Sequence, residues 1–345
     1  MRNAFFLKNL IIHLAVLIVI SAGLLTCKKK DSTNTPPLPD LIDGDPVSYY
    51  GPLKVAGNRI VDKDGKSVQL RGMSFFWSQW MGKYYTSDCV EWLKDDWHCN
   101  IVRAAMAVEE GGYLTNPEAE KKKIFDVVDA AIVHGIYVII DWHDHHATDH
   151  LKDAKKFFAE MAQKYGDKPN VIYETFNEPL QISWSSLIRP YHQGVIDTIR
   201  LYDPDNLIIC GTPTWSQDVD IAANDPLVGT NIGYSLHFYS GTHTQSLRDK
   251  AQTALNKGIA LMVTEFGTTN SSGDGDLYLN ETNSWFTFLD ENKISWCNWS
   301  VADKAEDSAA LLPGTSTTGG WTISQLTPSG SFIRSEIRAK NLWFQ

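Results

Sequence analysis

Apolar runs rich in β-branched residues recur at regular intervals along the chain. The eight runs cover residues 68–73, 100–106, 137–143, 171–177, 206–212, 232–239, 261–267 and 294–300. Because apolar residues are continuous within the runs and do not alternate with polar ones, the runs predict strands that are buried on both faces. Such strands are typical of a parallel sheet.

Amphipathic stretches with helical spacing lie between these runs. In residues 118–134, apolar side chains recur at steps of three and four, and Gly135 follows where a helix would end. Similar stretches cover residues 151–165 and 247–257. Repeated strand and helix units close most simply into a (β/α)8 barrel, so we predict an α/β protein with the TIM-barrel fold. An open doubly wound sheet is the alternative, but no G-x-G-x-x-G phosphate loop follows the first strand.

The segment before the first strand predicts a β-hairpin. Apolar and polar residues alternate in residues 53–62 and 67–70, on either side of an Asp64-Gly65 turn. We expect this hairpin to plug the bottom of the barrel.

The N-terminal segment resembles a bacterial lipoprotein signal. Arg2 and Lys8 precede an apolar run over residues 10–25, which is short for a membrane span of about 20 residues, and Cys27 follows. We therefore expect residues 1–27 to be a signal segment that ends at a lipidated Cys27. The lipid would anchor the exported protein in the membrane of the cell envelope. Ordinary secretion with cleavage nearby is the alternative.

The next segment has nothing to bury. Residues 28–48 are polar and proline-rich, and they predict a flexible, solvated tether. The folded domain is therefore expected over residues 49–345, a normal length for an α/β barrel. We expect it to be a monomer.

Charge and aromatic content limit the classes of partner. The formal net charge is −10, with 31 basic and 41 acidic residues, which argues against nucleic-acid binding because that requires a clustered basic face. The chain has 12 tryptophans and 13 tyrosines, which is many for its length. Several of them serve the core, and flat rings are also natural platforms for the faces of sugars.

Two of the predicted strands end on a glutamate. Glu178 is followed at once by Pro179, and Glu265 is followed by Phe266 and Gly267. In a barrel, working residues lie at the carboxyl ends of the strands, where the loops converge. Hydrolysis of a glycosidic bond needs two facing carboxyl groups, one protonated to assist the leaving oxygen and one ionised to attack or stabilise the sugar cation. Glu178 and Glu265 are therefore the candidate catalytic pair.

Three further residues bear on this pair. Arg103 would lower the pKa of Glu265 and keep it anionic, whereas Glu178, which lacks so close a cation, would have the higher pKa. Tyr239 could fix the nucleophile by a hydrogen bond. Glu174 lies in mid-strand, where a buried carboxylate more often holds an arginine, so we assign it a structural role.

Histidines after the third predicted strand invite a metal interpretation. His143, His145 and His146 lie in one short segment, and His150 follows. Neighbouring residues at a strand end point apart, however, and no matching His-x-His occurs on the first strand, so we predict no metal site. His143 is better explained as support for the acid or for a sugar hydroxyl. We expect no cofactor.

The cysteines contain no CxxC pair, which makes a thiolate zinc site a poor explanation for them. Cys210 and Cys297 lie in apolar runs and predict buried thiols. Cys89 and Cys99 could form a disulfide in an oxidising compartment, and their spacing leaves this open.

Short sequence blocks at the predicted strand ends occur in a specific order. They are Leu70-Arg-Gly-Met-Ser74, Asn100-Ile-Val-Arg-Ala-Ala-Met106, Ile140-Asp-Trp-His143, Val171-Ile-Tyr-Glu174 with Asn177-Glu-Pro179, Gly211-Thr-Pro-Thr-Trp-Ser-Gln-Asp-Val219, Leu236-His-Phe-Tyr239 with Gly241-Thr-His243, Val263-Thr-Glu-Phe-Gly267 and Trp296-Cys-Asn-Trp-Ser300. Together they resemble glycoside hydrolase family five, and specifically its bacterial cellulase branch. The resemblance runs from Leu53 to about Phe332.

The resemblance implies a retaining double displacement in which Glu178 is the acid/base and Glu265 is the nucleophile. It also implies that Asn177 binds the sugar 2-hydroxyl and that Arg103, His143, His237 and Tyr239 surround the catalytic pair. Trp299 would stack on the sugar at the cleaved bond and would form a cis peptide bond with Ser300. The resemblance places Trp80, Lys304 and Glu306 on the glycone side of the cleft and Trp215 on the aglycone side.

The chain departs from the family pattern at a few positions. It has Phe75 and Phe76 where relatives of this branch often have Ser and His, so a histidine is missing from the first loop. Ala107 stands where an aromatic residue is common. Both changes bear on the glycone side of the cleft and hence on substrate detail. Phe266 replaces a frequent tryptophan, and we expect that change to be neutral packing.

These observations predict a lipid-anchored, retaining endo-β-1,4-glucanase that cuts cellulose-like β-1,4-glucan chains internally. The nearest alternative is the same chemistry on another β-glucan, xyloglucan or a β-mannan, because pocket contacts set specificity. More distant alternatives are a non-catalytic glycan-binding lipoprotein and a metal-dependent amidohydrolase.

Overall fold

The computed structural model describes residues 44–341. Cys27, the rest of the predicted signal segment and most of the predicted tether lie outside the described residues. The fold begins earlier than the predicted boundary at residue 49, because α1 (Pro46–Tyr50) is already helical and its last residue is buried. Asp45 caps this helix by accepting a backbone N–H at 2.8 Å.

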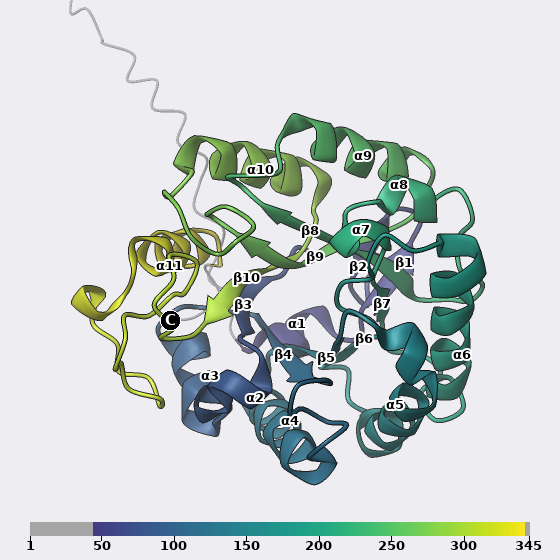
Figure 1. The fold of residues 1–345 in the computed structure, drawn as a ribbon, viewed down its shortest axis with the longest axis horizontal. Coiled ribbons are helices and arrows are strands. Elements are labelled where there is room, and N and C mark those ends of the chain that lie inside the picture. The colour runs from purple at the N-terminus through teal and green to yellow at the C-terminus, as the bar shows by residue number, and fades with distance from the viewer. Residues whose placement is uncertain (1–43, 342–345) are drawn as a thin grey trace, which may run out of the picture. The chain divides into compact units, whose positions relative to one another are not determined.

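Eight parallel strands form a closed barrel in which neighbours follow chain order (Figure 1). The strands are β3 (Arg71–Phe75), β4 (Ile101–Ala107), β5 (Tyr137–His143), β6 (Val171–Glu174), β7 (Ile208–Cys210), β8 (Ile232–Tyr239), β9 (Leu261–Gly267) and β10 (Trp296–Val301). Each overlaps one of the apolar runs, and the predicted (β/α)8 barrel is confirmed.

Helices surround the barrel and connect its strands (Figure 1). The α-helices that follow α1 are α2 (Ser78–Met81), α3 (Ser87–Asp95), α4 (Pro117–Val133), α5 (Leu151–Tyr165), α6 (Arg189–Ile199), α7 (Pro213–Ser216), α8 (Val219–Ala222), α9 (Gln245–Asn256), α10 (Leu279–Asn292) and α11 (Pro328–Lys340). Short 3-10 or π segments are η1 (Gly82–Tyr84), η2 (Ala147–His150), η3 (Trp184–Ile188) and η4 (Ile323–Gln325). The three helices predicted from spacing are α4, α5 and α9. Between residues 44 and 341, no helix has the length and apolar character needed to cross a membrane.

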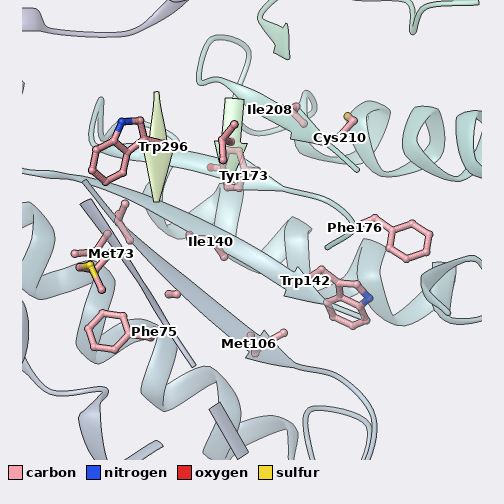
Figure 2. Packing of buried hydrophobic residues seen from close by; sticks show 14 of the residues in the cluster. Met73, Phe75, Met106, Ile140, Trp142, Tyr173, Phe176, Ile208, Cys210 and Trp296 are labelled. Carbon is pink, nitrogen blue, oxygen red and sulfur yellow. The ribbon is translucent and has the colours of Figure 1, made fainter. Parts of the chain in front are cut away.

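The hydrophobic core has two layers, one on each side of the strands. Outward-facing strand side chains such as Met106, Ile140 and Trp142 pack between the barrel and the helices, and they are fully buried (Figure 2). Inward-facing side chains fill the lower barrel, including Ile101 and Tyr137. The upper barrel interior is polar instead, so the apolar floor supports the polar groups above it.

The N-terminal hairpin packs on that floor, but its turn differs from the predicted one. β1 (Lys54–Ala56) and β2 (Arg59–Val61) are joined at Gly57 and Asn58, and Gly57 adopts the positive φ of 60° that the tight turn requires. The predicted Asp64-Gly65 turn forms as the next turn along the chain, between residues 62 and 66. The alternation was compatible with both turns, and the glycine of each turn has a positive φ, 60° at Gly57 and 79° at Gly65.

Strand β9 contains one extra residue relative to its neighbours. Ser235 of β8 lies opposite Met262. Two residues further along β8, His237 lies opposite Glu265, which is three residues further along β9. The pairing with β10 shifts by the same amount. This bulge lets the consecutive side chains of Thr264 and Glu265 both face the barrel interior, which simple alternation forbids.

Four cysteines lie within the described chain, and all four are buried and free: Cys89, Cys99, Cys210 and Cys297. Cys89 and Cys99 therefore do not pair here. Burial raises the pKa of Cys210 to about 12 and that of the other three thiols as well. These thiols are inert parts of the core.

Gly72 offers a test of how closely β3 and β4 approach. A Cβ added there would lie 1.7 Å from the carbonyl oxygen of Ile101, which is backbone and has no freedom to turn aside. We expect Gly72→Ala to lower the free energy of unfolding by about 2–3 kcal/mol, as overpacking of a rigid interior does. Urea unfolding followed by circular dichroism measures this.

Gly194 in α6 provides the matched control. A Cβ at Gly194 would meet only Leu151 Cδ1 at 3.6 Å, an ordinary contact. Gly194→Ala should therefore raise the free energy of unfolding by about 0.5–1 kcal/mol. Equal stability of Gly72→Ala and the wild type would contradict the pairing of β3 with β4.

Candidate active site

Arg103 is fully buried inside the barrel. Its Nε donates to Glu174 Oε2 at 2.7 Å, and Nη1 donates to Glu265 Oε2 at 3.0 Å. Nη2 donates to Asn177 Oδ1 at 2.6 Å and lies 2.9 Å from Asp141 Oδ2. One cation thus fixes side chains from β5, β6, the loop after β6 and β9. Glu174 has the arginine partner that the sequence analysis expected.

Glu265 lies on β9 with its carboxylate at the floor of a cleft. Its Oε1 accepts a hydrogen bond from the Tyr239 hydroxyl at 2.8 Å, and its Oε2 accepts from Arg103. Burial raises the pKa of Glu265 and the nearby Glu178 carboxylate raises it further, which outweighs the lowering by His237, Arg103 and Tyr239. The predicted low pKa of Glu265 is therefore wrong: Arg103 does lower it, but burial and the Glu178 carboxylate outweigh that effect.

Glu178 faces this carboxylate from the loop after β6. Its Oε1 lies 3.0 Å from His237 Nδ1, and its Oε2 lies 3.3 Å from His145 Nε2. Burial raises the pKa of Glu178, but the hydrogen bonds from His145 and His237 outweigh it and lower the pKa to about 2. The predicted higher pKa of Glu178 is wrong as well, because these two histidines are close cations that the prediction did not include.

His237 holds the proton that Glu178 lacks in this arrangement. Burial lowers the pKa of His237, but the carboxylate of Glu174 at 3.8 Å, the hydrogen bond to Glu178 and the nearby Glu265 outweigh it and raise the pKa to about 9. The proton shared by His237 and Glu178 therefore rests on the histidine, 3.0 Å from the carboxylate.

The two candidate catalytic carboxyl groups are close together. A carboxylate oxygen of Glu178, one of Glu265 and a ring nitrogen of His237 all lie within 4.8 Å of one another. Retaining glycosidases separate their two carboxyl groups by about 5–5.5 Å and inverting ones by about 6.5–9.5 Å. The close approach fits direct attack by one carboxylate and leaves no room for an inverting water.

His143 forms part of the cleft wall. Its Nδ1 lies 2.7 Å from Asp141 Oδ2, its ring stacks on Trp299 with centroids 5.3 Å apart, and Trp77 meets it edge-on at 4.1 Å. Burial lowers the pKa of His143, so the ring is neutral. The contacts with the candidate acid come instead from His237 and from His145, which the sequence analysis considered only as a metal ligand.

Trp299 supports the floor of the cleft at the end of β10. The bond between Trp299 and Ser300 is cis, as the family resemblance implied. The Phe76 ring lies 5.0 Å from that of Trp299, centroid to centroid. Trp299 is thus held between Phe76 and His143.

Two adjoining cavities meet at the carboxyl pair. Their volumes are about 380 Å³ and about 230 Å³. Glu178, Tyr239, Glu265 and Ser271 line both of them. The cleft therefore continues past the pair in both directions, and a long chain can occupy both sides.

The smaller cavity contains the residues expected on the glycone side. Trp80 lies at its mouth with 53% of its surface exposed, and Lys304 pairs with Glu306. Phe76 lies on this wall, with Lys304 Nζ 5.3 Å from its ring centroid. The departure from His to Phe thus makes this wall more apolar. Ala107 is fully buried and lines neither cavity.

The larger cavity contains Trp215, the residue expected on the aglycone side. Trp215 is 40% exposed, and it lies between Thr214 and Ser216 in a run of three residues with φ of 59°, 54° and 56°. Such left-handed conformations are costly for non-glycine residues and cluster at functional sites. The backbone N–H of Trp215 donates to the backbone carbonyl of Pro179 at 2.8 Å, and the Ser216 hydroxyl donates to the backbone carbonyl of Asn177 at 2.8 Å. The platform is therefore tied to the segment that carries the candidate acid.

Polar residues brace the loop that carries His145. The buried Asp144 accepts the backbone N–H of His146 at 2.8 Å and lies 2.7 Å from His150 Nδ1. Glu109 lies 3.0 Å from His146 Nδ1. Side-chain atoms of Glu109, Asp144 and His150 come within 4.8 Å of one another. Asp144 contacts His150 directly, and His146 links Glu109 to Asp144. His146 and His150 contact Glu109 and Asp144, whereas His145 points to the acid, so these histidines do not converge.

The sequence analysis assigned no role in the cleft to several residues that line the cavities: His145, Trp77, Gln217, His243 and Ser271. Gln217 and His243 stand inside the sequence blocks quoted for the family, and that position was a usable signal. Trp77, His145 and Ser271 lie on loops, where only the folded path brings them to the cleft.

Comparisons with known proteins agree with this geometry. Residues 61–305 match the family model described as cellulase (glycosyl hydrolase family 5). An endoglucanase from Clostridium saccharobutylicum is 50% identical over 299 residues, which cover 86% of this chain and 67% of that protein. This chain therefore spans about two thirds of the length of that relative.

Solved structures share the fold over nearly their whole length. A protein from Cytophaga hutchinsonii is 56% identical with a TM-score of 0.86, and the match covers 86% of this chain and 98% of that one. The catalytic domain of an endoglucanase from Thermobifida fusca, in complex with cellotetraose, is 36% identical with a TM-score of 0.82, over 86% of this chain and 100% of that one. The barrel, the facing carboxyl groups at its strand ends and these likenesses show that the chain belongs to glycosyl hydrolase family 5, the cellulase family.

Proposed function

We propose that the protein is a retaining endo-β-1,4-glucanase that cuts β-1,4-linked glucan chains at internal bonds. The observation that carries the proposal is the carboxyl pair of Glu178 and Glu265, whose oxygens come within 4.8 Å in the middle of a cleft that continues on both sides. A glucan lying along both cavities presents an internal bond to the pair.

Glu265 is the nucleophile and Glu178 is the acid/base. Glu265 attacks the anomeric carbon while Glu178 protonates the leaving glycosidic oxygen, so the bond to the leaving sugar breaks as a covalent glycosyl ester forms on Glu265. Glu178, now ionised, takes a proton from a water molecule, which attacks the same carbon and releases Glu265. Two displacements at one carbon retain its configuration.

The surrounding side chains prepare each role. Tyr239 and Arg103 hold the two oxygens of Glu265 in one orientation, which avoids reorganisation during attack. The proton for the leaving group lies on the His237 side of the hydrogen bond to Glu178. A sugar that fills the cleft excludes water, and this favours transfer of that proton to Glu178, because a buried neutral pair costs less than a buried ion pair.

Flat aromatic surfaces support a β-glucan as the substrate. Trp80 and Trp299 lie on one side of the carboxyl pair and Trp215 lies on the other, and their rings suit the faces of glucose units. The related Clostridium protein is named an endoglucanase, and the Thermobifida domain was solved with cellotetraose. Both observations favour a β-1,4-glucan over a mannan.

We further propose that lipid on Cys27 anchors the exported enzyme in the cell envelope and that the enzyme acts as a monomer. The support for the anchor is the cysteine placed directly after an apolar signal-like run. The polar, proline-rich residues between Cys27 and α1 would then tether the barrel to the membrane surface.

Glu265→Gln should abolish the reaction while leaving the fold intact. The wild type should release reducing ends from carboxymethylcellulose and lower its viscosity early, because internal cuts shorten chains quickly. An amide in place of the nucleophile should reduce this rate by at least about a thousandfold. Glu291→Gln, an exposed change on α10, is the matched control and should act like the wild type.

Two further measurements can contradict the proposal. Nuclear magnetic resonance of the first sugar released should show the β-anomer, and an initial α-anomer would mean inversion. Parallel assays on lichenan, xyloglucan and mannan test the substrate. Faster cleavage of mannan than of carboxymethylcellulose would contradict a β-1,4-glucan as the substrate and indicate a mannan.

The pH dependence should report the proton shared by Glu178 and His237. Because the pKa of His237 is raised to about 9 and that of Glu178 is lowered to about 2, the pair keeps one proton between these values. The rate constant kcat/KM should therefore fall as the pH rises through about 9. In His237→Asn only Glu178 can hold the proton, and its pKa lies below 9, so the alkaline limb should move to lower pH by at least about one unit.

His134→Asn at the end of α4, outside both cavities, is the control and should leave the alkaline limb in place. An unchanged limb in His237→Asn would assign the proton to another group.

Cys27→Ser should release the protein from the membrane. In a bacterial host, the wild type should incorporate radiolabelled palmitate and partition into Triton X-114, whereas the variant should do neither because it lacks the acylated thiol. Labelling of the variant at the level of the wild type would contradict the anchor at this cysteine.

A further inference from the structure

A polar cluster lies beneath the acid/base residue, on the far side of His237. Thr264, which immediately precedes the nucleophile, is fully buried. Its hydroxyl oxygen lies 2.5 Å from Glu174 Oε1, 2.5 Å from Ser235 Oγ and 2.8 Å from His237 Nε2. Ser235 Oγ also lies 2.7 Å from Glu174 Oε1. The cluster therefore connects Glu174 to His237, whose other nitrogen contacts Glu178.

The protons in this cluster determine which nitrogen of His237 carries hydrogen. Burial raises the pKa of Glu174, but the Arg103 guanidinium that donates to it and the nearby His237 outweigh this and lower the pKa to about 2, so Glu174 is ionised and only accepts. The Thr264 hydroxyl at 2.5 Å and the Ser235 hydroxyl at 2.7 Å both donate to Glu174 Oε1, so each hydroxyl uses its single proton on this carboxylate. No proton is left for Thr264 to donate to the ring, so His237 Nε2 must be the donor and Thr264 the acceptor.

We propose that Thr264 is a positioning residue for acid catalysis: by accepting the Nε2 hydrogen of His237 it fixes the tautomer of that ring and directs Nδ1 to share a single proton with Glu178. The inference rests on the proposed function, because it assigns Glu178 as the acid. When His237 is neutral, Nδ1 accepts the O–H of Glu178, and when His237 is charged, Nδ1 donates to the carboxylate. In both states the proton that will be transferred to the glycosidic oxygen lies between His237 Nδ1 and Glu178 Oε1.

The β9 bulge makes this arrangement possible. Without the extra residue, Thr264 and Glu265 would point to opposite faces of β9. With it, Thr264 reaches the ring below Glu178 while Glu265 reaches the cleft. One local irregularity thus serves both members of the catalytic pair.

The charges around His237 stay the same when Thr264 is changed to another neutral residue. The titratable or charged groups around the ring are Arg103 on β4, Asp141 and His143 on β5, Glu174 on β6, Glu178 after β6, Tyr239 and His243 on and after β8, and Glu265 on β9. A shift of the pH profile in a Thr264 variant would therefore come from the lost hydrogen bond.

Thr264→Val tests the proposal, because valine keeps the shape and removes the hydroxyl. The alkaline limb of kcat/KM on cellopentaose should move to lower pH by about one unit, since the imidazolium loses a charge-assisted hydrogen bond, and the value at neutral pH should fall about tenfold. On 2,4-dinitrophenyl β-cellobioside, whose leaving group needs no proton, kcat/KM should change less than about twofold. Thr264→Ser retains a hydroxyl and should restore the wild-type pH profile.

Thr268→Val is the structural control, because Thr268 is also buried and its hydroxyl bonds Ser329 at 2.7 Å, away from His237. It should lower thermal stability without moving the alkaline limb. If Thr264→Val does not fold, Thr264→Cys takes its place, since a thiol is a weak acceptor of similar size and should shift the limb in the same direction.

Two results would overturn the inference: an alkaline limb in Thr264→Val at the wild-type pH, or equal losses on the two substrates. A wild-type protein that cleaves neither cellopentaose nor the aryl cellobioside would overturn the proposed function itself, which is a distinguishable result.

Discussion

The buried guanidinium of Arg103 is the interaction on which the active site depends. A charge inside a barrel is tolerated only when hydrogen-bonded partners replace water, and here these partners come from four segments of the chain. The planar fork fixes Glu265, the proposed nucleophile, and Asn177, the proposed ligand of the sugar 2-hydroxyl, at the same time. The apolar floor below, closed by the hairpin, keeps water away from that charge.

Sharing this cation has a consequence for the chemistry. Arg103 also pairs with Glu174 and Asp141, and burial and the Glu178 charge outweigh its effect on Glu265, whose pKa stays raised, whereas His145 and His237 lower the pKa of Glu178. The acid and the nucleophile are therefore not separated by two fixed carboxyl pKa values alone. In the proposed mechanism the proton for the leaving group is held on the neighbouring His237 ring, within hydrogen-bond distance of Glu178, and exclusion of water by the bound sugar favours its transfer. Tight binding and proton delivery are thereby coupled.

Much of the fold was predictable because the signals are local. Continuous apolar runs predicted the eight strands, and the break after Glu178 and Glu265 predicted where the chemistry would lie. The hairpin turn at Gly57 was missed because alternation suits either turn. His145 and its contact with Glu178 depend on the path of a loop, and no local spacing reports that path. The pKa order failed for the same reason, since it is set by partners distant in sequence.

The bulge in β9 shows why the residues that position a catalytic group are harder to predict from sequence than the catalytic group itself. A period of two assigns Thr264 and Glu265 to opposite faces, and this rule makes Thr264 an outward residue with no role. The extra residue appears only in the register against β8 and β10, which is a property of the sheet and not of the segment. The strand end therefore suggests Glu265 as the nucleophile from sequence, whereas the groups proposed to orient the acid become visible only when the pairing of neighbouring strands is known.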